Sequence, residues 1–269
     1  MSLGGCDRWA PKLCAALVAL AGAFGATHDV RSRDIAAGER RSGYDDMSAE
    51  SRAMQDDDTA NPGMLWVLDG ETLWRRPAGS AGKACADCHG DVRQTMRGVA
   101  ARYPAFDAAR ERPVDLAGRI NLCRAERQGA PALAAESRDL LALATLVALQ
   151  SRGQPIGNDD PRLAPVIEQG RSLFEQRQGQ LDLSCSQCHD DNAGRKLAGS
   201  TVPQGHPNGY PLYRLEWQGL GSLQRRLRNC LTGMRAELYA FGAPELVALE
   251  AYLVWRARGM KMESPAVRP

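Results

Sequence analysis

The sequence is short of aromatic residues and histidine, and neither sign of charge predominates. Its 269 residues include 4 Phe, 6 Tyr, 5 Trp and 4 His, and 34 basic side chains face 32 acidic ones for a net charge of +2. This near balance gives no reason to expect a nucleic-acid partner. The length allows two domains, but so few aromatic side chains supply little apolar volume for two cores.

The sequence also gives no sign of a membrane span. The apolar run from Leu13 to Ala23 is too short to cross a bilayer. It follows Arg8 and Lys12 and ends in Ala-Gly-Ala, an arrangement typical of a secretory signal peptide. We expect residues 1–23 to be this signal, cleaved near Ala23, and the mature chain to lie in the periplasm. No cysteine closely follows the cleavage site, so a lipid anchor is not expected.

Four of the eight cysteines form two C-x-x-C-H motifs, at positions 85–89 and 185–189. This pattern is typical of c-type haem attachment, in which two thiols bond to the haem and the adjacent His ligates iron. A redox dithiol or half a zinc site is the alternative, although zinc needs further close ligands and only His28 and His206 remain. We therefore predict two covalently bound haem c groups, which also supply apolar mass for the cores. The residues expected to attach them are Cys85, Cys88, Cys185 and Cys188, with His89 and His189 as iron ligands.

The surroundings of the two motifs repeat as well. Positions 70–74 match positions 170–174 at the same offset as the motifs, and each segment begins a short helix that leads into its motif. Positions 139–143 match positions 245–249, and each opens an apolar helix that we expect to end at an Arg-Gly pair, 152–153 or 258–259. This order predicts a mainly α protein with two class I cytochrome c-like domains in tandem and an N-terminal arm.

Composition marks the domain boundaries. Gly and Pro in positions 153–161 indicate a linker, which divides a first domain at 61–154 from a second at 155–269. Positions 24–60 form the arm, in which Ser48 can cap a helix that runs to about Gln55. From composition alone, this arm either packs on a domain or partner or is a disordered linker. Beyond Gly259 we expect only a short tail.

Two cysteines of the mature chain are left over, Cys123 and Cys230. Each precedes the last helix of its module, where a class I cytochrome places its second iron ligand. Met96 lies too close to His89 for this role, although Met234 is plausible for the second haem. A Cys123–Cys230 disulfide or two free buried thiols are the alternatives. Because the two positions are equivalent in a repeat, we favour Cys ligation of both irons, which implies low reduction potentials.

Basic residues precede the second of these cysteines. Arg226 lies four residues before Cys230, on the same face if the segment is helical. A cation there lowers the pKa of a thiol and can hold a sulfur oxyanion, with Arg225 or Arg228 as possible helpers. A solvated basic helix face is the alternative. His206 lies in the irregular middle of this module as an axial ligand, a proton carrier or, most simply, a hydrogen-bonded loop residue.

These segments together resemble the SoxA family, the dihaem subunit of the SoxAX cytochrome of thiosulfate-oxidising bacteria. The matching segments are 41–44, 61–66, both C-x-x-C-H motifs, 120–124, 205–211, 226–230, 234–237 and 266–269. The resemblance implies His/Cys ligation of both haems. It also implies that Cys230 is the active-site cysteine, found as a persulfide, that Arg226 is its active-site arginine, and that His206 is the histidine near this haem.

The resemblance further implies an L-cysteine S-thiosulfotransferase. A SoxX-like monohaem subunit would complete the enzyme, which would couple thiosulfate to a cysteine of a SoxYZ-like carrier and pass two electrons to a cytochrome c acceptor. Two other functions stay open from the residues themselves. A dihaem electron carrier needs no substrate pocket, and a dihaem peroxidase needs an openable iron, which Cys at both positions disfavours.

Overall fold

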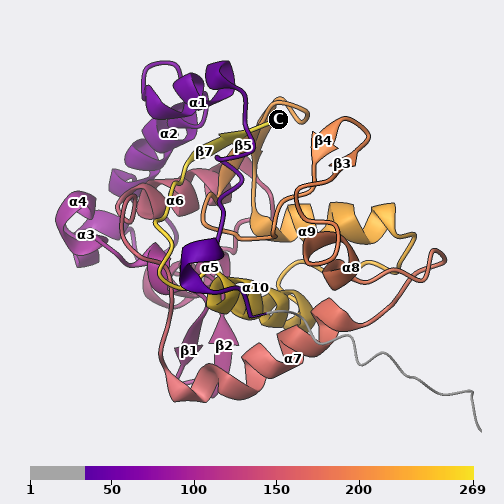
Figure 1. Ribbon diagram of the computed structural model, residues 1–269. Coiled ribbons are helices and arrows are strands. Elements are labelled where there is room, and N and C mark those ends of the chain that lie inside the picture. The colour runs from indigo at the N-terminus through magenta and orange to yellow at the C-terminus, as the bar shows by residue number, and fades with distance from the viewer. Residues whose placement is uncertain (1–33) are drawn as a thin grey trace, which may run out of the picture. The chain divides into compact units, whose positions relative to one another are not determined.

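The computed structural model describes residues 34–269 (Figure 1). The predicted signal peptide, which contains Cys6 and Cys14, lies outside the described residues. His28, in the predicted arm, lies outside them as well. Within residues 34–269, no helix is both long and apolar enough to cross a membrane. These residues contain two helical modules that repeat the same order of elements, so the prediction of a mainly α fold with two modules in tandem is confirmed.

The first module places its haem motif beside two crossing helices. Its helices are α2 (Met64–Arg75), α3 (Cys85–His89), α4 (Val92–Thr95), α5 (Leu116–Cys123) and α6 (Arg138–Leu149), with a 3-10 turn η2 (Ala100–Arg102) and a π-helical turn η3 (Arg124–Gln128). An antiparallel hairpin of β1 (Ala105–Asp107) and β2 (Arg112–Val114) precedes α5. Helices α2 and α6 pack against each other, and α3 follows α2 along the chain.

The second module follows the same plan. Its helices are α7 (Ala164–Glu175), α8 (Cys185–His189), α9 (Leu223–Gly233) and α10 (Pro244–Arg256), preceded by the 3-10 turn η4 (Pro161–Leu163). Its strands are the exposed hairpin β3 (Lys196–Leu197) and β4 (Ser200–Thr201), and a three-stranded sheet of β6 (Gly219–Gly221), β5 (Leu212–Arg214) and β7 (Ala266–Arg268). Helix α7 packs on α10 as α2 packs on α6.

A glycine lies at each of these two helix crossings. A Cβ at Gly170 in α7 would overlap the carbonyl oxygen of Ala248 in α10, and one at Gly70 in α2 would lie 2.5 Å from the carbonyl oxygen of Ala142 in α6. Both obstacles are backbone atoms, which cannot move aside without shifting a helix. Within each pair, the two helices therefore lie closer together than a side chain larger than glycine at these positions would permit.

We expect Gly170→Ala to lower the free energy of unfolding by about 2 kcal/mol, because overpacking forces α7 away from α10. Denaturant unfolding of the haem-loaded protein measures this effect. Gly233→Ala is the control, since a Cβ at Gly233 in α9 meets nothing within 4 Å. Equal unfolding free energies for the two variants would contradict the close-approach explanation.

The last helix of each module ends earlier than expected. Helix α6 ends at Leu149 and α10 at Arg256, whereas the sequence placed their ends at 152–153 and 258–259. The residues beyond the helices exchange backbone hydrogen bonds with distant segments, because Gly153 N donates to Met262 O and Gly259 N donates to Ile156 O, both at 2.8 Å. These contacts replace the final helical turns and tie the linker to the end of the chain.

The C-terminal segment is part of the core, so the expectation of a mere tail was wrong. Strand β7 pairs in parallel with β5, and Ala266 and Val267 are fully buried. Helix α1 (Ala49–Asp56), capped by Ser48 as predicted, covers β7 from the arm (Figure 1). Gln55 Oε1 accepts a hydrogen bond from Val267 N at 3.0 Å. The described part of the arm, which begins with the 3-10 turn η1 (Ala37–Glu39), is thus packed on the second module.

The two modules are joined through the helices that carry the leftover cysteines. Gln224 in the first turn of α9 donates to Asp115, the N-cap of α5, at 2.8 Å, and both side chains are buried. Residues 34–269 form one compact unit. The predicted boundary between residues 154 and 155 therefore divides two sequence repeats, and it does not divide two separately packed domains.

Candidate functional site

The first C-x-x-C-H motif opens onto a cavity of about 220 Å³. Cys85, Cys88 and His89 from α3 line it together with Cys123 from the end of α5. Apolar side chains, including Leu143 of α6, form most of the remaining wall. Polar and basic side chains also line it, namely Lys83, Arg119, Arg124, Arg127 and Gln128. Two thiols, an imidazole and a further thiol around one largely apolar space fit a covalently held haem with His and Cys as candidate ligands. Met96, considered as a rival ligand, lines this cavity as well.

The second motif has its imidazole held in a defined orientation. His189 Nδ1 lies 2.7 Å from the carbonyl oxygen of Pro203, and Gly205 packs so close that a Cβ there would lie 3.3 Å from the His189 ring. A hydrogen bond at Nδ1 fixes the tautomer and leaves Nε2 free to bind a metal. Because that is the arrangement expected of a haem-ligating histidine, the residues of this site fit the cofactor.

Cys230 in α9 faces the second motif. Burial opposes ionisation of the thiol, but a hydrogen bond with His189 and the charges of Arg226 and Arg214 outweigh it and lower the pKa of Cys230. Burial, with the nearby Cys230 and Cys188, raises the pKa of Cys185 to about 12. The electrostatic influence of these groups on one another places the sulfur atoms of Cys185, Cys188 and Cys230 and the imidazole of His189 near one another.

Of the competing interpretations of Cys123 and Cys230, the disulfide is not formed in residues 34–269, whereas two free thiols agree with the structure. None of the six cysteines in residues 34–269 forms a disulfide, so Cys123 and Cys230 are not joined to each other. Within the same residues, no group of three His, Cys, Asp or Glu side chains lies close enough to hold a metal ion unaided. A zinc site would need further protein ligands beside either motif, whereas a haem supplies four of the iron ligands itself.

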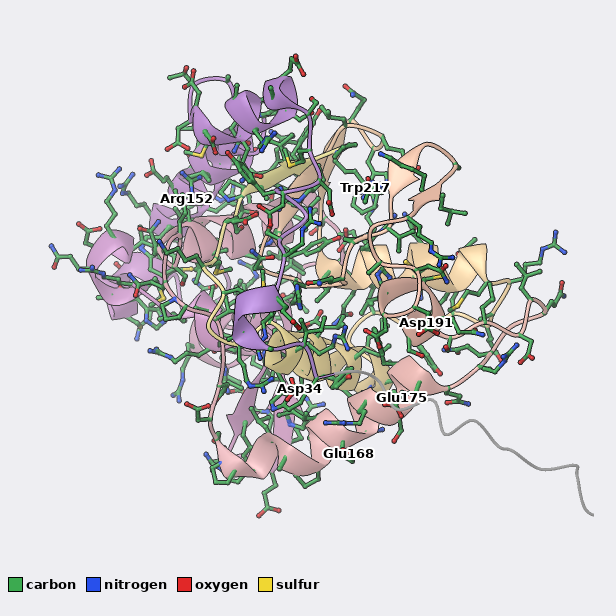
Figure 2. The ribbon with its side chains drawn as sticks, in the orientation of Figure 1. Asp34, Arg152, Glu168, Glu175, Asp191 and Trp217 are labelled. Atoms are coloured by element: carbon green, nitrogen blue, oxygen red, sulfur yellow. The ribbon has the colours of Figure 1, made fainter. Side chains whose placement is uncertain are left out.

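The three arginines of α9 point to different partners. Trp217, which is labelled in Figure 2, lies in the turn between β5 and β6. The Arg225 guanidinium lies 4.2 Å from the centre of its ring. That of Arg228 lies 4.6 Å from the Phe241 ring and donates to the Tyr239 carbonyl oxygen. Within residues 34–269, Arg226 pairs with no carboxylate, and it is the α9 arginine whose charge acts on Cys230. The predicted helpers Arg225 and Arg228 are therefore occupied elsewhere.

Arg214, which the sequence analysis missed, also acts on Cys230. Arg214 ends strand β5, and its Nε donates to Glu216 Oε2 at 2.8 Å. Its charge also lowers the pKa of Cys230, by less than the charge of Arg226 does. A signal was present in the sequence, because positions 103–123 and 210–230 align from end to end without a gap. Each segment starts with a cis Tyr-Pro bond, runs through a hairpin and an N-capped helix, and carries the leftover cysteine at its end.

His206 lies beside this site and is held by the arm. Its Nδ1 is 2.9 Å from the Arg41 carbonyl oxygen, and its buried Nε2 has no partner within the described residues. Burial lowers the pKa of His206 to about 4, against the hydrogen bond with Arg41. The ring is therefore neutral near pH 7, a hydrogen-bonded loop histidine with one nitrogen still available.

A second feature missed from the sequence is a buried ion pair behind the second motif. Arg256 at the end of α10 donates to Asp190, the residue after His189, at 2.6 Å, and both side chains are almost wholly buried. The Arg256 guanidinium also lies 4.7 Å from the centre of the Phe174 ring. This pair fixes the end of α8 to α10 and so helps to orient His189. Removing one partner would leave a buried charge uncompensated.

Comparisons with known proteins agree with this geometry. The sequence model of the family "SoxA/TsdA, cytochrome c domain" matches residues 69–156 and 169–262, one match for each module. The SoxA subunit of L-cysteine S-thiosulfotransferase from Pseudaminobacter salicylatoxidans is 40% identical over 232 residues, covering 86% of this chain and 81% of its own. That from Rhodovulum sulfidophilum is 38% identical over 232 residues, covering 86% and 80%.

A solved structure is similar over the same extent. The crystal structure of SoxXA from P. pantotrophus superposes with a TM-score of 0.82 at 33% identity, covering 86% of this chain and 87% of the matched chain. Sequence and fold thus agree over most of the chain, and the family model matches each module in turn. This chain belongs to the SoxA family of cytochromes c.

Proposed function

We propose that this chain is the SoxA-like subunit of an L-cysteine S-thiosulfotransferase. The relatives described above carry that name. The observation that carries the proposal is the second site, where a buried thiol with a lowered pKa faces the motif histidine beside an arginine without a carboxylate partner in residues 34–269. A thiol, a metal-binding imidazole and a nearby cation together suit the oxidation of a sulfur anion.

The cofactors of this proposal are two haem c groups. Thioether bonds would join one to Cys85 and Cys88 and the other to Cys185 and Cys188. The iron ligands would be His89 with Cys123 at the first, and His189 with Cys230 at the second. Haem c supplies one-electron redox chemistry. Thiolate ligation favours the ferric state, so low reduction potentials are expected at both sites.

The proposed reaction joins thiosulfate to a cysteine of a carrier protein. Arg226 attracts the thiosulfate dianion and holds its sulfonate oxygens by charge-assisted hydrogen bonds. The Cys230 thiolate forms a sulfur–sulfur bond to the terminal sulfur of thiosulfate, and two electrons leave. A thiolate of the carrier then attacks this bond by thiol–disulfide exchange, takes the thiosulfate group and releases the Cys230 thiolate. The balance is one thiosulfate and one carrier thiolate in, one carrier S-thiosulfonate and two electrons out.

The proposed role of His206 is that of a neutral hydrogen-bonding group beside the reacting sulfur. With its Nδ1 held by Arg41, its Nε2 is the atom that could bind a proton or a substrate oxygen. Because burial keeps the pKa of His206 near 4, the ring would serve near pH 7 as a hydrogen-bond partner rather than as a permanent charge.

The proposed partners follow from the relatives. A SoxX-like monohaem cytochrome subunit would form a heterodimer with this chain, as the similar SoxXA structure suggests. A SoxYZ-like protein would be the carrier, a cytochrome c the electron acceptor, and the periplasm the compartment. A plain dihaem electron carrier is the alternative, but it gives no role to an arginine whose charge acts on a buried thiol. A dihaem peroxidase is disfavoured by the Cys at both distal positions.

Haem stoichiometry tests the cofactor proposal. We expect the mature wild-type protein to carry two haems by intact mass and one in the double variant Cys85→Ala, Cys88→Ala, because each motif attaches its own group. The remaining haem should keep the spectrum assigned to the second site. The matched double variant Cys185→Ala, Cys188→Ala should keep the other. A wild-type mass with a single haem would refute the dihaem proposal.

The activity is tested with the purified complex of this chain and its monohaem partner. Thiosulfate, a thiol-bearing carrier and oxidised cytochrome c are the substrates. We expect the carrier to gain the mass of one thiosulfate group for every two cytochromes reduced. Electron transfer without any mass gain on the carrier would instead support the electron-carrier alternative.

A further inference from the structure

The two modules place opposite charges at one equivalent position beside the leftover cysteine. Asp107 is the last residue of β1, where it pairs with Arg112 in the hairpin, and Arg214 is the last residue of β5, where it pairs with Gly219. The gapless alignment that sets Cys123 against Cys230 also sets Asp107 against Arg214. A negatively charged side chain in the first module therefore occupies the position of a positively charged one in the second.

A second arginine is common to both modules. Arg119 in α5 and Arg226 in α9 each lie four residues before the leftover cysteine, on the helix face that carries it. Arg119 lines the same cavity as Cys123, and the charge of Arg226 acts on Cys230. The helix arginine alone therefore does not distinguish the two sites.

In the first module the strand residue neutralises the helix arginine. The Asp107 carboxylate lies 3.0 Å from Arg119 and 3.1 Å from Arg110, and its side chain is only 4% exposed. Burial opposes its ionisation, but the two arginines outweigh burial and lower the pKa of Asp107. An anion entering this site would be repelled by the fixed Asp107 carboxylate, which already forms an ion pair with Arg119.

In the second module, the described residues include no buried acid that neutralises the helix arginine. Arg226 forms no ion pair with a carboxylate of residues 34–269, and the acid whose pKa its charge helps to lower is Glu216. The acid paired with Arg214 is Glu216, whose side chain is 64% exposed. An exposed ion pair contributes little to stability because water and salt screen it, so an incoming dianion can displace this carboxylate. Two arginines then face one anion beside Cys230.

We propose that this hairpin position decides which of the two sites accepts a sulfur oxyanion, Arg214 admitting it to the second site and Asp107 excluding it from the first. Both modules keep the haem motif, the leftover cysteine and the helix arginine. The reversal of charge at positions 107 and 214 acts directly on that arginine and cysteine, and it can therefore separate the substrate site from an electron relay. The inference rests on the function proposed above for the identity of the anion. The preference of an anion for the second site over the first follows from the charges of the two sites themselves.

Sulfite binding to the haem-loaded complex tests the role of Arg214. The probe is sulfite alone, titrated without carrier and followed by the absorption and electron paramagnetic resonance signals of each haem. We expect the wild type to respond only at the second haem. Arg214→Gln should weaken this binding about 10- to 100-fold, the effect of losing one charged hydrogen-bond donor, and Arg214→Lys should recover most of it. Arg225→Gln is the matched control, because Arg225 and Arg214 both lie against Trp217, and it should bind sulfite as the wild type does.

The converse change tests exclusion from the first site. Asp107→Asn removes the charge but keeps the shape, and it should give the first haem a saturable sulfite response that the wild type lacks. An unchanged spectrum before sulfite is added shows that the module remains folded. The inference is overturned if the wild type shows no response at the second haem, if Arg214→Gln binds like the wild type, or if the first haem of Asp107→Asn stays silent when the second is saturated. These titrations involve no coupling, so a failure of the transferase assay leaves their outcome untouched.

Discussion

Replacing Cys230 with alanine is expected to reduce coupling of thiosulfate to the carrier by at least about 10³-fold, since the sulfur that forms the new bond is lost. The same change removes the proposed ligand opposite His189. The second haem should therefore lose its low-spin thiolate signal, and its reduction potential should rise. Haem content should stay the same, because attachment depends on Cys185 and Cys188.

The matched variant is Cys123→Ala, which makes the same substitution at the equivalent position of the first module. It should change the spectrum of the first haem alone and keep most of the coupling activity, since no substrate bond forms there. Activity is measured by mass gain on the carrier, and ligation by electron paramagnetic resonance. A Cys230→Ala protein that holds both haems and couples at the normal rate would disprove the proposed chemistry.

Arg226→Ala is expected to lower kcat/KM for thiosulfate by about 10²-fold, the effect of removing a charge-assisted contact to a dianion. Arg226→Lys should recover part of this loss, because it restores the charge but not the forked donor geometry. The same variants should weaken sulfite binding at the second haem without changing haem content. Steady-state kinetics over a range of thiosulfate concentrations separates a binding defect from a slower chemical step.

Arg228→Ala is the control for this prediction. Arg228 is on the same helix, but it is occupied by Phe241 and the Tyr239 carbonyl oxygen. It should lose less than about threefold in kcat/KM, in keeping with a change outside the site. If Arg226→Ala and Arg228→Ala lose activity equally, the basic residues act as a general docking surface and not as a substrate clamp.

The architecture of this chain could be predicted from local signals. The C-x-x-C-H motifs are short and chemically specific, and the similar segments before and after them identified the helices on either side. Ser48 was correctly predicted as a helix cap because capping depends on only a few neighbouring residues. Cys123 and Cys230 were recognised as equivalent from the same repeat, although their ligation of iron remains a prediction.

The features that escaped prediction depend on contacts between distant residues. The pairing of β7 with β5 joins Ala266 to Leu212, which are far apart in the sequence, and short strands without an alternating pattern give little local signal. The Asp190–Arg256 pair spans 66 residues. Arg214 is different, because its alignment with Asp107 was visible in the sequence. It was overlooked because the two modules were compared only at the haem motifs, their flanking helices and the leftover cysteines, and the hairpin residues between these were not aligned.

Strand β7 has a consequence for how the protein is made. It follows every other described element along the chain, yet it pairs with β5, which carries Arg214, and it packs against α1. The second module therefore cannot complete its three-stranded sheet until residues 266–268 have been synthesised. We therefore expect the cofactor ligation machinery to meet a second module whose sheet is still open.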